Sequence, residues 1–166
     1  MKVAFDTLPG TSKVWIYQSS RRFTQEEEDR IQTAAEEFVD SWTAHQAGLK
    51  AGVKIMYHHF LIIAVDESYN NASGCSIDKQ VHFVQSQGSK FNIDFFNRMN
   101  IVCKLSGSEF LLTPVSNIEK LLHDGSISSD TITFNNLVDN LRDFSTGWEV
   151  KISDSWIANF IDRKEA

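Results

Sequence analysis

The chain has 166 residues, of which 42% are hydrophobic and 23% are charged, with 22 Asp and Glu against 16 Lys and Arg. These values are typical of one globular domain. They exclude a disordered tail, a disulfide-stabilised mini-protein, a collagen-like chain and a long repeat array. The formal net charge of −6 repels phosphate backbones, so we expect no nucleic-acid partner.

The sequence favours a cytoplasmic protein with no membrane insertion. Its longest apolar run, Phe60–Val65, is far too short to cross a bilayer. No apolar stretch follows Met1-Lys2, so no secretory signal is expected. Cys75 and Cys103 lie in dissimilar contexts, which favours two free thiols, with a Cys75–Cys103 disulfide as the alternative.

The first half of the chain predicts a strand, a helix and a hairpin. Residues 1–12 are expected to be a loose N-terminal segment. A strand is predicted at Val14–Tyr17, and a helix begins at Thr24, where Glu27 completes a capping box. We expect Gly48 to end this helix. A hairpin over residues 53–65 follows, because apolar residues alternate and then run continuously.

The remainder of the chain predicts a second helix followed by shorter elements. The polar loop 66–78 leads into a helix that begins near Ser76 and ends by Gly88. A hairpin is expected over residues 101–112 and a short helix after Pro114. The last part, residues 126–166, is predicted to be an extension packed on the core: a strand, a short helix, a further strand and a terminal helical turn.

The order of these elements predicts the fold class. We expect one two-layer α+β domain over residues 1–166, with a ferredoxin-like βαββαβ core, a C-terminal strand and short helices. The alternative is another antiparallel sheet with helices on one face. A one-sided sheet leaves an open edge, so a homodimer is also expected.

Two short segments look like parts of an ATPase. Leu61–Glu67 resembles a Walker B strand, and Leu105–Glu109 resembles a degenerate ABC-transporter signature. The chain has no glycine-rich phosphate loop ending in Lys-Ser or Lys-Thr, and the two segments come in the reverse of the usual order. We therefore do not expect ATP hydrolysis.

Three segments carry a family resemblance: Val14–Ser19, the pair Trp42 and His45, and above all Ser73–Asp78. Together they resemble a family of short, uncharacterised bacterial proteins that are often called ABC transporter ATPases although they lack a Walker A motif. The resemblance covers roughly residues 13–160. It implies no established activity and no catalytic residues.

The best candidate site is the stretch Ser73, Gly74, Cys75, Ser76 and Asp78. Backbone N–H groups at a helix start attract anions, and the helix dipole favours a thiolate there. The stretch therefore predicts either a site for a small anionic ligand or a reactive thiol at Cys75. The competing interpretation is structural, with the serines as helix caps and the cysteine as a small packed residue.

No metal site and no cofactor are predicted. His45, His58, His59 and His82 could in principle join Cys75, but adjacent histidines in a strand point to opposite faces. No ligand spacing typical of zinc sites occurs in the chain.

The function that we expect is a non-enzymatic cytoplasmic binding module. Its partner is expected to be a protein or a small anionic ligand near loop 66–78. The alternative is a thiol-dependent enzyme that uses Cys75 as nucleophile, with a histidine from another part of the chain as base. ATPase activity comes third.

Overall fold

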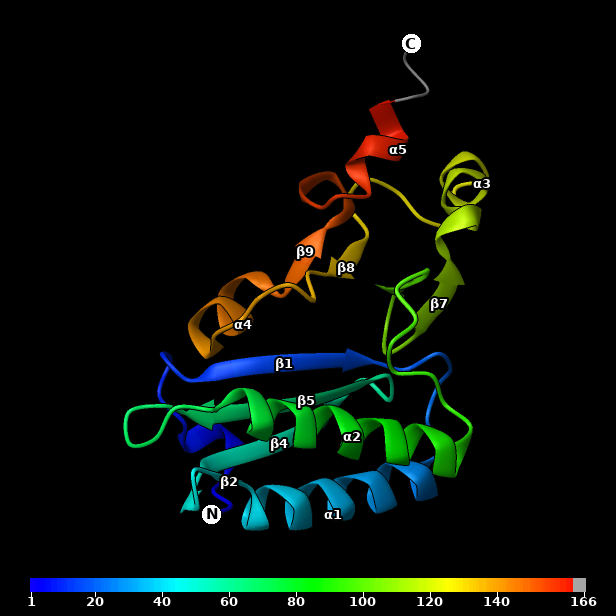
Figure 1. Ribbon diagram of the computed structural model, residues 1–166. Coiled ribbons are helices and arrows are strands. Elements are labelled where there is room, and N and C mark those ends of the chain that lie inside the picture. Colours follow the sequence, from blue (N-terminus) through cyan, green and yellow to red (C-terminus); the bar gives the residue numbers. More distant parts are fainter. Residues whose placement is uncertain (163–166) are drawn as a thin grey trace.

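The computed structural model describes residues 1–162 as a mixture of helices and antiparallel strands (Figure 1). The strands are β1 (Lys13–Gln18), β2 (Thr43–Ala44), β3 (Ala47–Gly48), β4 (Lys50–Met56), β5 (Phe60–Asp66), β6 (Asn100–Lys104), β7 (Phe110–Pro114), β8 (Ile132–Phe134) and β9 (Glu149–Lys151). The α-helices are α1 (Gln25–Ser41), α2 (Gly74–Phe91), α3 (Ile118–His123), α4 (Leu141–Gly147) and α5 (Ala158–Asp162). These bounds confirm the predicted α+β class.

The first sheet has β5 at its centre, in the order β1-β5-β4. All seven residues of β5 are buried. Leu61, Ile63 and Val65 pack in one cluster with apolar residues of α1 and α2, whereas Phe60 and Ile62 pack in a second cluster with residues of the second sheet. This division follows from the period of two in a strand, and it explains why the run is continuously apolar.

The second sheet has the order β7-β6-β8-β9 and lies above β1 in Figure 1. Val102 of β6 belongs to the cluster shared with the first sheet. Ile101 and Cys103 face the other way, into a third cluster with Ile118 of α3 and Ile157 before α5. The protein is therefore layered as helices, first sheet, second sheet and terminal helices. A small third sheet pairs β2 with β3.

The predicted ferredoxin-like core is not shown. That core requires β6 to pair with the outer edge of β1, so that four strands form one sheet. Instead, β6 pairs with β7 and β8 in the second sheet, and β1 pairs with β5 alone among the strands of residues 1–162. Because β6 has apolar side chains on both faces, it can be buried inside a second sheet of its own.

The helix α1 begins as predicted but ends earlier. The Thr24 side chain accepts the Glu27 N–H, and the Glu27 carboxylate accepts the Thr24 N–H, so the capping box is confirmed. The predicted end at Gly48 is wrong, because the helix stops at Ser41 and the β2–β3 hairpin follows. The turn of that hairpin holds two residues with positive φ, which a helix does not accommodate.

The helix α2 runs three residues past its predicted end at Gly88. It ends at Phe91, where Asn92 adopts a left-handed C-cap with φ of 54°. Gly88 is buried inside the helix and lets the returning chain come close: a Cβ atom there would lie 2.5 Å from the Ile93 carbonyl oxygen. This close approach positions Phe95 and Phe96, which line the groove described below.

The first residues of the N-terminal segment, Met1–Val3, are held along the outer edge of β4. The Val3 N–H donates to the Ala51 carbonyl oxygen over 2.9 Å, and the Ala51 N–H donates to the Met1 carbonyl oxygen over 3.1 Å. Within the C-terminal part, Phe134, Leu141 and Trp148 are buried against the first sheet. The edge of β4 is thus covered, and the edge of β1 lies on the opposite side of the sheet.

We expect the substitution Gly88→Ala to lower the free energy of unfolding by about 1–3 kcal/mol, because the added methyl group would meet backbone rather than a flexible side chain. Gly74→Ala at the start of the same helix is the matched control. Nothing lies within 4 Å of a Cβ atom there, so stability should be unchanged or raised by up to about 1 kcal/mol. Urea unfolding of both variants checks this, and equal stabilities would contradict it.

Candidate functional site

The serines of the predicted site act as helix caps. The Ser73 hydroxyl oxygen accepts the Ser76 N–H over 3.2 Å, and the Ser76 hydroxyl donates to the Ser73 carbonyl oxygen over 2.8 Å. The Trp42 indole N–H donates to the Ser76 carbonyl oxygen over 2.8 Å, which fastens the helix start to the end of α1. The structural interpretation of these two serines therefore has direct contacts in its favour.

The other three predicted residues, Gly74, Cys75 and Asp78, are exposed on the first turns of α2. The Cys75 thiol makes no hydrogen bond within residues 1–162, and His82 is also exposed further along the helix. Neither of the two hollows described in this section is lined by any of the five predicted residues. The structure thus brings the five together at one helix start but adds no base or cavity to them.

The acidic residues of the same loop are occupied by local contacts. One Asp66 oxygen accepts the Ser68 N–H over 3.0 Å, and the other lies 3.4 Å from the Lys50 ammonium nitrogen. Hydrogen bonds from Ser68, and then the Lys50 charge, hold the pKa of the buried Asp66 below its ordinary value. A Glu67 oxygen accepts the Ala72 N–H over 3.0 Å.

The histidines do not form a metal site in the part of the chain that the structure describes, where no three His, Cys, Asp or Glu side chains gather. His58 pairs with Glu28, and the ring of His59 bonds the Tyr57 carbonyl oxygen over 2.7 Å. Burial lowers the pKa of His59 below its ordinary value. Each of these two histidines thus serves a contact within the fold.

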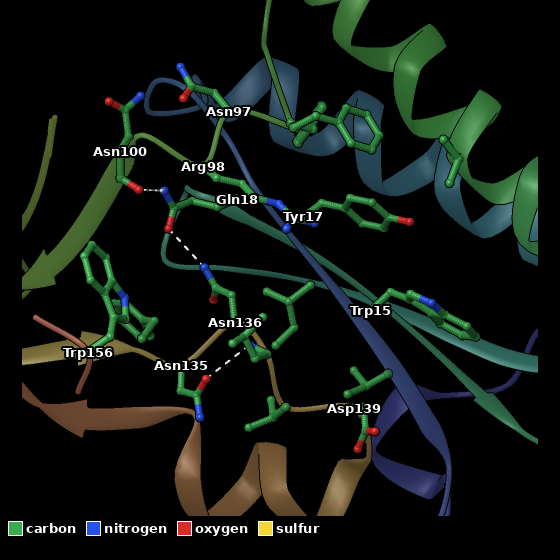
Figure 2. Close-up of a pocket in the computed structure, with 18 of the residues that line it drawn as sticks. Trp15, Tyr17, Gln18, Asn97, Arg98, Asn100, Asn135, Asn136, Asp139 and Trp156 are labelled. Carbon is green, nitrogen blue, oxygen red and sulfur yellow. Dashed lines mark hydrogen bonds between the residues drawn. The ribbon is translucent and has the colours of Figure 1, made fainter. Parts of the chain in front are cut away.

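A hollow lies elsewhere, along the outer edge of β1 (Figure 2). We call it the edge groove; its volume is about 600 Å³. It is lined by β1, by residues 95–98, Asn100 and 134–139, by Val81 of α2 and by Trp156. Sequence reasoning did not find it, because its walls come from segments far apart in the chain.

The groove follows the edge of the strand and not one of its faces. Trp15 and Tyr17 belong to the helix side of the first sheet, whereas Val14 and Ile16 belong to the side of the second sheet. All four line the groove. Because alternate side chains of a strand point to opposite faces, only a hollow at the strand's edge meets both sets.

Hydrogen bonds mark the two ends of the groove. At one end, the Val14 N–H donates to the Asp139 carbonyl oxygen and the Leu141 N–H donates to the Ser12 carbonyl oxygen, both over 2.9 Å. At the other end, the Gln18 amide donates to the Asn100 carbonyl oxygen and accepts from Asn136, as the dashed lines in Figure 2 show.

Between these ends the backbone of β1 is open. The Ser19 N–H bonds the His59 carbonyl oxygen on the β5 side, and alternation along the strand then directs the N–H groups of Val14, Ile16 and Gln18 away from β5. Val14 is satisfied by Asp139. Within residues 1–162, no backbone partner exists for the outward groups of Ile16 and Gln18.

Exposed apolar side chains gather at the groove. Phe96, Leu137 and Trp156 line it and are 44%, 85% and 50% exposed. Leu137 lies in the part of the chain for which the sequence predicts a short helix, but it precedes that helix, because α4 begins only at Leu141. Met99, which is 66% exposed, lies in the 95–100 segment that forms one wall. Large apolar side chains grouped in this way are typical of binding surfaces.

Polar groups complete the lining. Four asparagines and Gln18 contribute amides, and Arg98 contributes a cation that has no ion-pair partner within residues 1–162. Lys13 lies over the Trp15 ring, 5.3 Å from its centre. The asparagines stand in the polar segments 94–100 and 135–140, where they flank exposed apolar residues. That local mixture is the signal from which the sequence could have indicated the groove.

The Tyr17 hydroxyl anchors the helix side of the groove. It accepts a hydrogen bond of 2.7 Å from the buried amide of Gln80 on α2, and its ring contacts that of Phe96. Burial raises the pKa of Tyr17 above its ordinary value. A second hollow, lined by Ser20, Gln85, Ser89 and neighbouring residues, adjoins the groove through Phe95 and Phe96.

Comparisons with protein-family models, with curated proteins and with solved structures each find no match. Among residues 1–162, no helix combines the length and the apolar character that crossing a membrane requires.

The two cysteines should differ in reactivity. Cys75 is exposed, whereas Cys103 is buried and burial raises its pKa to about 11. We expect iodoacetamide at about pH 7 to label Cys75 in the folded protein and Cys103 only after unfolding, because the thiolate is the reacting species. Mass spectrometry of the labelled chain checks this, with Cys75→Ser as the control that should remain unlabelled while folded. Labelling of Cys103 in the folded protein would contradict the expectation.

Proposed function

We propose that this chain is a non-enzymatic binding module whose ligand lies in the edge groove. The observation that carries the proposal is the exposure of Phe96, Leu137 and Trp156 at one hollow. Full burial of such a side chain contributes roughly 1.5–3 kcal/mol, and a bound partner recovers the share of this that corresponds to the exposed area. The volume of the groove also falls within the usual range for ligand sites.

The predicted location near loop 66–78 is a second candidate for the binding site. The cap contacts of Ser73 and Ser76 and the local bonds of Asp66 and Glu67 give its polar groups structural roles. In its favour, Tyr69 is 77% exposed on this loop. The edge groove is the stronger candidate, because there the apolar side chains meet open backbone groups and a hollow.

The alternative activity, a thiol enzyme that uses Cys75, is supported by the exposure of that residue at a helix start. A discriminating measurement is the alkylation rate of Cys75: a rate far above that of N-acetylcysteine at about pH 7 would favour the enzyme. An ATPase role has less support, since the Asp66 carboxylate at the end of the Walker-B-like strand is buried and engaged by Ser68 and Lys50.

Binding at the groove is tested by selecting peptides from a random displayed library on the immobilised full chain. We expect enriched peptides whose affinity falls about tenfold or more with Leu137→Ser, because truncation of an apolar contact residue costs of order 1–2 kcal/mol. Leu137 is 85% exposed, so its replacement should leave stability unchanged.

The matched control is Tyr69→Ser, which removes an equally exposed apolar side chain from loop 66–78. We expect this variant to bind the enriched peptides with unchanged affinity. Loss of binding with Tyr69→Ser but not with Leu137→Ser would move the site to the loop. Failure to enrich any peptide would count against a peptide-binding module.

The homodimer expected from the sequence stays a prediction. The exposed apolar side chains at the edge groove, Phe96, Leu137 and Trp156, are the surface that a second copy would cover without entering the groove. Sedimentation velocity at micromolar concentration checks it. A dimer is expected, and a monomer throughout this range would remove the prediction.

A further inference from the structure

We propose that the ligand of the edge groove is an extended peptide segment of another protein, which adds to β1 as a further strand and places a carboxylate beside Arg98. This inference rests on the proposed binding function and deepens it by naming the class of ligand. It draws on the open backbone of β1, on the chain's own use of the same strand position, and on the charge of the groove.

The open backbone is chemically specific for another backbone. The outward N–H of Ile16 and the outward N–H and C=O groups of Gln18 alternate along the edge with the spacing of a strand. They stand in a hollow and have no backbone partner within residues 1–162. An extended peptide supplies the complementary groups at the same spacing, as in recognition by strand addition.

The chain itself shows that a strand fits at this edge. Asn140 forms an antiparallel bridge with Lys13, and two hydrogen bonds of 2.9 Å flank that bridge. Residues 134–138, which come just before this bridge in the sequence, do not pair with β1. They form the far wall of the groove instead. No strand of residues 1–162 pairs with the outer edge of β1 over Trp15–Gln18, a length of about 13 Å that matches roughly four peptide residues.

The far wall also decides between a peptide and a second copy of this chain. A strand that enters the groove has β1 on one side and residues 134–139 on the other. The β1 strand of a second copy is already flanked by its own Asp139–Leu141 segment and its own groove wall, so it cannot enter between these two sides. A short extended segment without such neighbours can.

Charge indicates the side chain that the peptide carries near Gln18. Arg98 is exposed, lines this end of the groove, and is drawn in Figure 2 reaching toward β1. Arg98 makes no ion pair within residues 1–162, whereas the Asp139 carboxylate at the opposite end accepts a hydrogen bond of 3.0 Å from the Asn140 side-chain amide. A carboxylate on the peptide would supply the partner that Arg98 lacks, in the bidentate geometry that guanidinium favours.

The test uses the peptide acetyl-Glu-Val-Thr-Val-Thr-amide and amide NMR of the full ¹⁵N-labelled chain. We expect the peptide to shift the amide signals of Ile16 and Gln18 and to slow their hydrogen exchange. The amides of Trp15 and Tyr17, which face β5, should keep their exchange rates. The same peptide with N-methylated valines should bind at least about tenfold more weakly, because methylation removes backbone donors.

Two variants separate strand addition from other binding. Ile16→Pro removes an outward N–H without removing a β1–β5 bond, so the fold should persist while peptide affinity falls at least about tenfold. Arg98→Glu should weaken binding of the glutamate peptide about two- to fivefold. It should strengthen binding of the matching lysine peptide by a similar factor.

The outcomes distinguish this inference from the function on which it rests. Shifts at the Trp156 indole and at Phe96, with no protection of Ile16 and Gln18, would overturn strand addition while supporting ligand binding in the groove. No shift anywhere, or equal binding of the N-methylated peptide, would also overturn it, and the proposed binding function would then be judged by the library selection alone. If Ile16→Pro fails to fold, the N-methylated peptide decides.

Discussion

β5 is buried on both faces, and its two apolar sides hold the layers of the molecule together. Leu61 and Ile63 face the helices, while Phe60 and Ile62 face the second sheet. Each buried side chain of this kind contributes roughly 1.5–3 kcal/mol, so removing either layer would expose several such contributions at once. β5 pairs with β4 along one edge, where the two form a hairpin, and with β1 along its other edge. The positions of both sheets therefore follow from the burial of one strand.

Burial of β5 on both faces does not cover the two outer edges of the first sheet, which are formed by β4 and β1. Residues 1–3 cover β4 by backbone hydrogen bonds, whereas Asp139–Leu141 cover β1 only near Lys13. The second sheet packs over one face of the first sheet. Its segment 134–139 pairs with β1 only near Lys13, so an open stretch of β1 remains between this segment and residues 95–98. An uncovered edge carries an aggregation risk, which the groove walls limit by restricting access to narrow chains.

The helix α2 stabilises this edge through polar contacts that an amphipathic pattern does not predict. It turns Ser76, Gln80 and Gln87 toward the core, where the Gln80 amide donates to the Tyr17 hydroxyl. The side-chain amide oxygen of Gln80 is buried without a hydrogen-bond partner within residues 1–162, and this lowers the stability of the fold. This arrangement holds the Tyr17 ring in place beside Phe96 at the groove. Of the apolar residues that the sequence predicts to face inward on this helix, Val84 is fully buried, whereas Ile77 and Val81 are only half-buried.

Local structure could be read from the sequence because its causes lie within a few residues. The Thr24–Glu27 capping box, the apolar alternation of the 53–65 hairpin and the Ser73 cap each depend on near neighbours, and each occurs in the fold. Only the tertiary structure decided that β6 joins a second sheet, because apolar residues on both of its faces suit either partner. The edge groove was decided in the same way. Its walls meet only when distant segments pack around β5. The mixture of asparagines and apolar residues in segments 94–100 and 135–140 can mark each wall, but it does not predict that the two walls meet.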